Sequence, residues 1–327
     1  MSAHVQFKVR VAPSSWWPRG RTFLHDDLVY SDAVTLDEAD ALLALYDPTE
    51  ELLRFQGPKV WYTYEPSWHT HYRRHPIGRR LAKTLPASEW LHFANPDPRF
   101  RVPNITFSHE LSKPRVKGFS RKGAVATVNY NGGRHWYLKP HIWLRNRMIL
   151  EPRVELFGRR SEWQKFRDFP AVWRQSYPGN YRGETKLTHL QDLFCEFLSR
   201  YKVYVCLENS NEPYFFTEKF VNAARAGCIP VYHAHPTVAK RFLEGAKWID
   251  PKDHGFSARR TLDCALAADI AEFQSANDAW LNSGVIDHTG FRGFFTRIHA
   301  LLKAKLTSDP ALPLSAEAAR RLDSIPE

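Results

Sequence analysis

The chain has 327 residues, which is more than one ordinary compact core holds and predicts two domains. Hydrophobic residues make up 43% of it and charged residues 25%, a composition that excludes extensive disorder. The formal net charge of +11 predicts anionic partners. No polybasic run or nucleic-acid-binding motif accompanies this charge, so we expect a phosphorylated substrate and no specific nucleic acid.

The first hundred residues predict alternating strands and helices. The elements expected, in chain order, are a strand over 5–12, a helix over 35–46 with Thr35 as its N-cap, a strand over 59–65, a helix over 78–85 and an extended segment over 90–94. No window has the unbroken apolar stretch of a signal peptide or membrane anchor, and the four cysteines are widely spaced. We therefore expect a cytoplasmic protein with reduced thiols, and a peripheral contact with a membrane surface stays open.

A connection between domains is predicted over residues 103–122, which lose periodicity and carry Pro, Gly and charge. This places an acceptor-side domain at 1–119, a second domain at 120–303 and a tail at 304–327. The second domain predicts strands at 124–130, 153–158, 202–208, 228–234 and 247–250, and helices at 139–150, 191–201, 217–227, 237–243 and beyond 258. Strands alternating with helices predict an α/β fold with parallel sheets, as two Rossmann-like domains facing a central cleft.

The segment from Tyr201 to Gly227 carries the strongest functional pattern. Its apolar strand ends abruptly at Glu208 and Asn209, a polar loop follows, and a helix opens at Thr217, a natural N-cap. Ligands of open parallel sheets bind beyond the carboxyl ends of the strands, and free amides in a first helical turn favour an anion. Lys219 is unfavourable at the positive end of a helix, and a bound diphosphate would explain it. An ordinary exposed helix start remains the alternative.

This segment resembles the donor-binding signature of the alpha-1,3-fucosyltransferases, in which a hydrophobic strand ends in Glu-Asn-Ser and is followed by an aromatic-bearing loop and Thr-Glu-Lys. The continuation AGCIPVYHA is similar to the strand that follows in that family. The matching positions, which the resemblance implies to be donor-binding, are Glu208, Asn209, Ser210, Phe215, Thr217, Glu218 and Lys219. It implies that Lys219 contacts the diphosphate and that Glu218 and Asn209 contact the ribose or the sugar. Phe215 stands where the family often has Tyr, so one hydroxyl is missing.

Other family residues are placed by shorter resemblances. KVWYTYE resembles the strand that delivers the catalytic base, which would be Glu65. VRVAPSSWW resembles the opening of bacterial members and makes Trp16 and Trp17 candidates for the cleft wall. The diphosphate-binding arginine precedes RVELFGR, where the basic candidates are Arg134, Lys139, Arg145 and Arg147. The LRN context favours Arg145.

The resemblance implies a GT-B-type enzyme that transfers fucose from GDP-fucose, with inversion, to a hydroxyl of a glycan acceptor, an oligosaccharide or glycoconjugate, in an alpha-1,3 linkage. Retaining enzymes of similar architecture often carry two glutamates eight positions apart, and the residue eight beyond Glu208 is Phe216. Two alternatives stay open. One is a related transferase with another nucleotide sugar, and the other is a non-catalytic relative that binds glycans or nucleic acid.

We expect chemistry that needs neither a metal nor a cofactor, because the sequence contains no Asp-x-Asp motif. Two groups of histidines are candidate metal ligands, and their members are His69, His71, His75, His233 and His235. They lack cysteines or carboxylates at a recognised spacing, so no metal site is predicted from them. The first group is expected near the acceptor.

Overall fold

The structure is a computed structural model. It describes residues 6–14, 17, 19–63, 75–92, 95, 97, 100–101, 121–129, 139–159, 179–185, 191–283 and 291–307. The chain divides into two compact units, of which unit 1 comprises Met1–Asn104 with Phe291–Glu327 and unit 2 comprises Ile105–Gly290. This division differs from the predicted one, which assigned residues up to 303 to the second domain.

Unit 1 is built on a six-stranded sheet with the order β2-β3-β1-β4-β5-β6. The strands are β1 (Phe7–Val11), β2 (Thr22–His25), β3 (Leu28–Ser31), β4 (Ala41–Leu45), β5 (Lys59–Tyr62) and β6 (Trp90–Leu91). Its helices are α1 (Glu51–Arg54), α3 (Pro76–Thr84), the short 3-10 helix η1 (Ala87–Glu89) and α11 (Phe291–Thr307). Only β2 and β3 pair antiparallel among these strands, as a hairpin at one edge.

The helix predicted over residues 35–46 is wrong, because Ala41–Leu45 form strand β4. All five residues of β4 are buried, since the strand lies between β1 and β5 in parallel pairing. A parallel strand that is covered on both faces reads as a continuous apolar run, which periodicity does not distinguish from a buried helix. Thr35 donates both its backbone N–H and its hydroxyl to the Glu38 carboxylate within a turn, so it caps no helix here.

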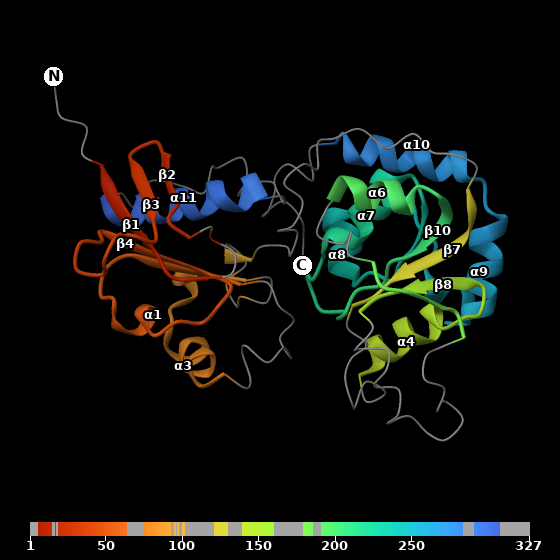
Figure 1. Cartoon of the computed structure of the whole chain (residues 1–327), viewed down its shortest axis with the longest axis horizontal. Helices are drawn as coiled ribbons and strands as arrows, with labels where there is room; N and C mark the ends of the chain where they lie inside the picture. Colours follow the sequence, from red (N-terminus) through yellow and green to blue (C-terminus); the bar gives the residue numbers. More distant parts are fainter. Residues whose placement is uncertain are drawn as a thin grey trace. The chain divides into compact units, whose positions relative to one another are not determined.

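Helix α11 packs on the sheet of unit 1 although almost two hundred residues separate it from β6. The side chain of His299 lies 3.2 Å from the Tyr30 hydroxyl, and Lys303 pairs with Asp27 at 3.1 Å. Lys305 lies 3.6 Å from Glu89 in η1. Figure 1 shows α11 in blue beside the red strands β1 to β3. These contacts explain why the predicted boundary at residue 303 differs from the observed one at 290/291.

Unit 2 is an all-parallel five-stranded sheet with the order β11-β10-β7-β8-β9. The strands are β7 (Lys122–Thr127), β8 (Val154–Phe157), β9 (Tyr181–Gly183), β10 (Tyr201–Val205) and β11 (Ile229–Val231). The helices are α4 (Pro140–Ile149), α6 (Gln191–Leu198), α7 (Glu218–Ala226), α8 (Pro236–Phe242), α9 (Ala258–Ala267), α10 (Ile270–Leu281) and the 3-10 helix η7 (Pro251–His254). The α/β class with parallel sheets is confirmed. The predicted elements follow in the expected order, except that the strand expected over 247–250 is only a single bridge between Ile249 and Val231 and that β9 was not predicted.

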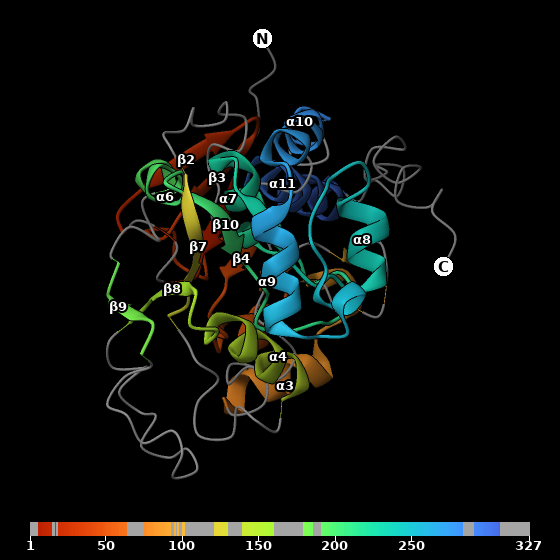
Figure 2. The ribbon, with the colours of Figure 1, turned by 90° about the vertical axis from the view of Figure 1, so that its right-hand side faces the viewer.

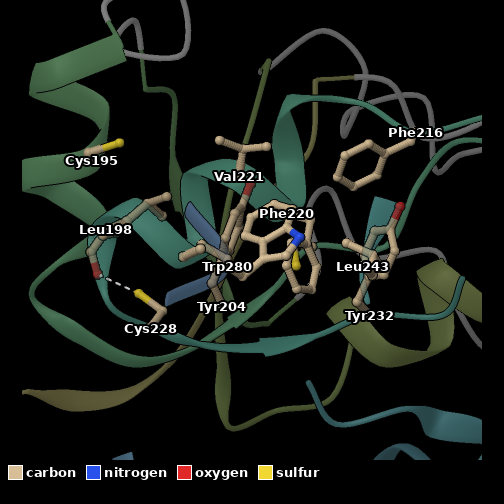
Figure 3. Close-up of a cluster of buried hydrophobic side chains, with 14 of the residues drawn as sticks. Cys195, Leu198, Tyr204, Phe216, Phe220, Val221, Cys228, Tyr232, Leu243 and Trp280 are labelled. Carbon is tan, nitrogen blue, oxygen red and sulfur yellow. Dashed lines mark hydrogen bonds between the residues drawn. The ribbon is translucent and has the colours of Figure 1, made fainter. Parts of the chain in front are cut away.

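Successive side chains from Val203 to Cys206 alternate between two separate cores. Tyr204 and Cys206 face a cluster with α6, α7, α8 and Trp280 of α10, whereas Val203 and Val205 face a cluster with α4 and α9. Both views show β7 and β8 between α6 above and α4 below (Figures 1 and 2). Figure 3 shows Phe220 of α7 at the centre of the first cluster, beside Trp280. The sheet is therefore covered on both faces, and its polar groups gather at the strand ends.

The cysteines are all unpaired thiols, and three of the four are buried. Burial raises the pKa of Cys195 to about 11 and that of Cys228 to about 12, so both stay protonated at neutral pH. Among the helices of the described ranges, none combines the length and the apolar character that crossing a membrane requires.

Candidate functional site

The carboxyl end of β10 meets the first turn of α7 in unit 2. The Thr217 side chain caps α7 by accepting a hydrogen bond from the Lys219 amide at 3.4 Å, as predicted. At the other end Gly227 has the left-handed φ of 67° that ends many helices. Helix α7 thus begins and ends where the sequence indicates, and its amino end points to the end of the sheet where ligands bind.

Glu208 is a buried carboxylate that holds the N-cap residue of α7, Thr217, in place. Its side chain is 1% exposed and accepts hydrogen bonds from the Thr217 amide at 2.9 Å, the Thr217 hydroxyl at 2.7 Å and the Tyr232 hydroxyl at 3.1 Å. Burial raises the pKa of this carboxyl, and the Lys219 ammonium counters that effect. All these contacts are internal, so Glu208 positions the loop and the helix rather than presenting a free carboxylate.

Lys219 turns back from the helix toward two carboxylates. Its Nζ lies 3.1 Å from Glu208, 3.5 Å from Glu218 and 3.0 Å from the Thr217 hydroxyl. Burial disfavours the charge of Lys219, but the two carboxylates outweigh it and raise its pKa. The sequence suggested a bound diphosphate as the reason for a cation at this helix end. Glu208 and Glu218 supply a second reason that needs no ligand.

Arg145 of α4 reaches the same strand end. Its guanidinium is 1% exposed and donates to the side-chain oxygen of Asn209 at 2.5 Å and to that of Asn146. Arg147 instead is exposed and stacks 4.5 Å above the ring of Trp143, and Lys139 occupies the N-cap position of α4. Arg145, the favoured basic candidate, is therefore joined to the signature residue Asn209. Arg134 lies outside the described residues.

Two histidines lie at this edge. No role was predicted for His141 from the sequence, and His233 was considered there only as a metal ligand, which was not predicted. His141, in the first turn of α4, stacks on His233 with 6.1 Å between ring centroids, and His233 pairs with Asp250 at 2.8 Å. Burial, with His233 and Arg145 adding to it, lowers the pKa of His141 to about 3, so the ring is neutral. Only the position of His141 at a predicted helix start, beside the favoured arginine, could have indicated it.

Some of the remaining predicted residues are described by the structure and others are not. Phe215 is buried at 3% exposure, and Glu218 and Lys219 keep 24% and 21% of their side chains exposed. His75 precedes α3 at its N-cap position, and His235 caps α8 by accepting from the Thr237 amide. Four other residues with predicted roles lie outside the described residues, namely Glu65, Trp16, His69 and His71.

Residues 174–268, which contain β10, α7 and β11, match the family model described as glycosyltransferase family 10 (fucosyltransferase) C-term. The match covers less than a third of the chain, and it includes every residue of the predicted donor signature from Glu208 to Lys219. Arg145 lies before it.

Two solved structures are similar to this chain over most of its length. A UDP-forming trehalose-phosphate synthase from Burkholderia xenovorans is similar over 84% of this chain and 75% of its own, with 13% identity and a TM-score of 0.50. A crystal structure of an alpha1,3-fucosyltransferase with GDP-fucose aligns over 94% of this chain and 92% of its own, with 16% identity and a TM-score of 0.43. The fold is of the GT-B type, built from two α/β units.

Proposed function

We propose that the chain transfers fucose from GDP-fucose to a hydroxyl of a glycan acceptor, with inversion and in an alpha-1,3 linkage. The observation that carries this proposal is the meeting of Arg145, Lys219 and the first turn of α7 at the end of β10. These groups belong to or adjoin the family 10 segment, and each is suited to a diphosphate. Glycosyl transfer needs positive charge where the diphosphate leaves.

The electrostatics favour an anion between the two cations. The positive charge of the Arg145 guanidinium acts to lower the pKa of both Lys219 and His141, because it repels their protonated forms. A diphosphate placed there would offset this repulsion, and the amides of the first turn of α7 add partial positive charge. The two carboxylates near Lys219 hold the ammonium in place before the ligand arrives.

Two further residues are suited to the ribose or sugar hydroxyls. Glu218 is partly exposed in the first turn of α7, and Asn209 follows the end of β10 with its side-chain oxygen on Arg145. We assign the proton-accepting role to Glu65 on the family resemblance, because the acceptor hydroxyl loses a proton in the reaction. The position of a second glutamate, expected for retention, holds Phe216, which is fully buried against Phe242 at 5.6 Å.

Binding of GDP tests the diphosphate site directly. Isothermal titration calorimetry with Arg145→Lys should give GDP affinity about 10- to 100-fold below that of the unchanged chain, because a charge-assisted hydrogen bond contributes about 1.5–3 kcal/mol. Lys219→Met should weaken GDP binding by a similar factor. Arg147→Lys is the matched control, since the residue lies on the same helix but is exposed on Trp143. Equal affinity in all three variants would refute the site.

The reaction itself is tested with GDP-fucose and an array of glycan acceptors, with product mass and linkage as the readout. Glu65→Gln should abolish transfer and leave GDP affinity nearly unchanged. A thermal shift with UDP or CMP sugars but not with GDP-fucose would favour the transferase with another donor. Salt-dependent RNA binding without GDP affinity would favour the non-catalytic alternative.

A further inference from the structure

A second cluster of polar side chains lies in unit 1, where the β2–β3 hairpin faces α11. His25 ends β2, Asp26 follows in the turn with a left-handed φ of 50°, and His299 comes from α11. One ligand atom from each of these three side chains lies within 4.8 Å of the other two. Residues that are 273 positions apart in the chain thus converge on one point.

His299 is oriented toward this point. Its side chain is 8% exposed, and its Nδ1 lies 3.2 Å from the hydroxyl of the fully buried Tyr30. Its Nε2 lies 3.3 Å from a carboxylate oxygen of Asp26 but forms no hydrogen bond within the described part of the chain. A buried nitrogen without a hydrogen bond is costly, and an ordinary histidine–carboxylate pair would have satisfied it. The geometry leaves Nε2 available for another kind of partner.

The surroundings distinguish Asp26 from its neighbour. Asp27 pairs with Lys303 of α11 at 3.1 Å, whereas the Asp26 side chain is 63% exposed and faces the two imidazoles. The His25 ring meets the His299 ring edge-on, with 4.3 Å between centroids. Phe295 packs on both Tyr30 and His25, so apolar rings flank the cluster. Two imidazoles and one carboxylate therefore share a site with an apolar wall and an open side.

We propose that His25, Asp26 and His299 bind a divalent transition-metal ion, for which zinc is the best match. Zinc takes histidine nitrogens and carboxylate oxygens at about 2.0–2.2 Å, often with three protein ligands and one water. A metal-bound histidine commonly donates its other ring N–H to an oxygen, which here is the Tyr30 hydroxyl beside Nδ1. The exposed Asp26 and the half-buried His25 would move inward by ~1 Å to reach these bond lengths.

The ion would fasten α11 to the hairpin of unit 1. Its three ligands belong to unit 1, whereas the proposed donor residues Arg145, Glu218 and Lys219 belong to unit 2, so we assign the ion a structural role in unit 1. Because its ligands come from both ends of the chain, it closes a very long loop, which limits the unfolded chain more than a local clip does. Metal removal should therefore loosen α11 and leave nucleotide binding unchanged.

Zinc titration of the full-length chain, without a histidine tag and after chelator treatment, tests the site. Calorimetry should show one ion per chain, and the thermal midpoint should rise by about 5–10 °C at a zinc concentration ~100-fold above the Kd. His25→Gln and Asp26→Asn should each lower zinc affinity at least about tenfold. Both positions are more exposed than His299, so the variants should fold, which far-ultraviolet circular dichroism checks. His254→Gln in unit 2 is the matched control.

Two results would overturn the proposal. One is zinc affinity that His25→Gln and Asp26→Asn leave unchanged, or no binding at all. The other is a cobalt-substituted spectrum with sulfur-to-metal charge-transfer bands, which would assign the ion to cysteine thiols instead. Cobalt absorption typical of nitrogen and oxygen ligands, lost in both variants, would support it.

Discussion

Replacing Glu208 by alanine should destabilise unit 2 strongly. The side chain is 1% exposed, and its removal deprives the Thr217 amide, the Thr217 hydroxyl and the Tyr232 hydroxyl of an acceptor. It also leaves the Lys219 ammonium without its nearer carboxylate, at 3.1 Å. Breaking a buried ion pair from one side lowers the free energy of unfolding by about 3–5 kcal/mol.

Two further substitutions separate the charge from the hydrogen bonds. Glu208→Gln retains an acceptor oxygen for Thr217 and should lower the free energy of unfolding by only about 1.5–3 kcal/mol. Glu218→Ala is the control, because Glu218 is partly exposed and lies 3.5 Å from Lys219, so its loss should change stability by at most about 1 kcal/mol.

Urea unfolding followed by circular dichroism measures these differences, with an unchanged m-value as the sign that the same surface unfolds. Hydrogen exchange of the α7 amides locates the loss, since the effect should concentrate in that helix. A change below about 1 kcal/mol for Glu208→Ala, or equal losses for Glu208→Ala and Glu218→Ala, would refute the role of Glu208 as the support of the helix start.

Three further predictions concern the same unit. The pKa of His141 is about 3 in the folded chain and 6.5 in the unfolded chain. The contribution of the buried neutral ring to stability is therefore present above pH 6.5 and lost as the pH falls toward 3. Urea unfolding between pH 6.5 and 4 should show a dependence that His141→Gln reduces by up to about 1.4 kcal/mol per pH unit, and identical slopes would contradict the neutral state. Phe220→Ala empties the centre of the cluster beside Trp280 and should cost about 3–5 kcal/mol by the same method; a loss near zero would mean that α7 does not pack as described. Gly227→Ala places a Cβ at a φ of 67° and should lower the free energy of unfolding by about 1–2 kcal/mol, whereas a gain in stability would argue against the left-handed cap.

The helical caps and strand ends of unit 2 could be predicted because their signals are local. Thr217 and Gly227 mark the two ends of α7 through the properties of single residues. The strand β4 was mistaken for a helix because both faces of it are buried, a fact that depends on which strands lie beside it. Local patterns therefore identified the elements of unit 2 that caps and strand ends mark, and they failed at β4, where a buried apolar run follows the capping pattern of Thr35.

The candidate site shows the same limit. The signature from Glu208 to Lys219 lies in one stretch of sequence, so its proximity follows from the strand, loop and helix. The burial of Glu208 and its bonds to Thr217 and Tyr232 do not follow, because they depend on packing beneath the loop. His25 and His299 lie 274 residues apart, so nothing in the sequence indicated that they lie close together.

The return of α11 to unit 1 sets an order on how the protein matures during synthesis. The whole of unit 2 is synthesised before residue 291 is added, and unit 2 has its complete sheet and both of its cores without α11. Unit 1 remains incomplete until α11 is synthesised, because Tyr30 and Asp27 have their partners His299 and Lys303 on that helix. The segment made first is thus completed last, and the exposed face of the waiting sheet is where a nascent chain would need protection by a chaperone.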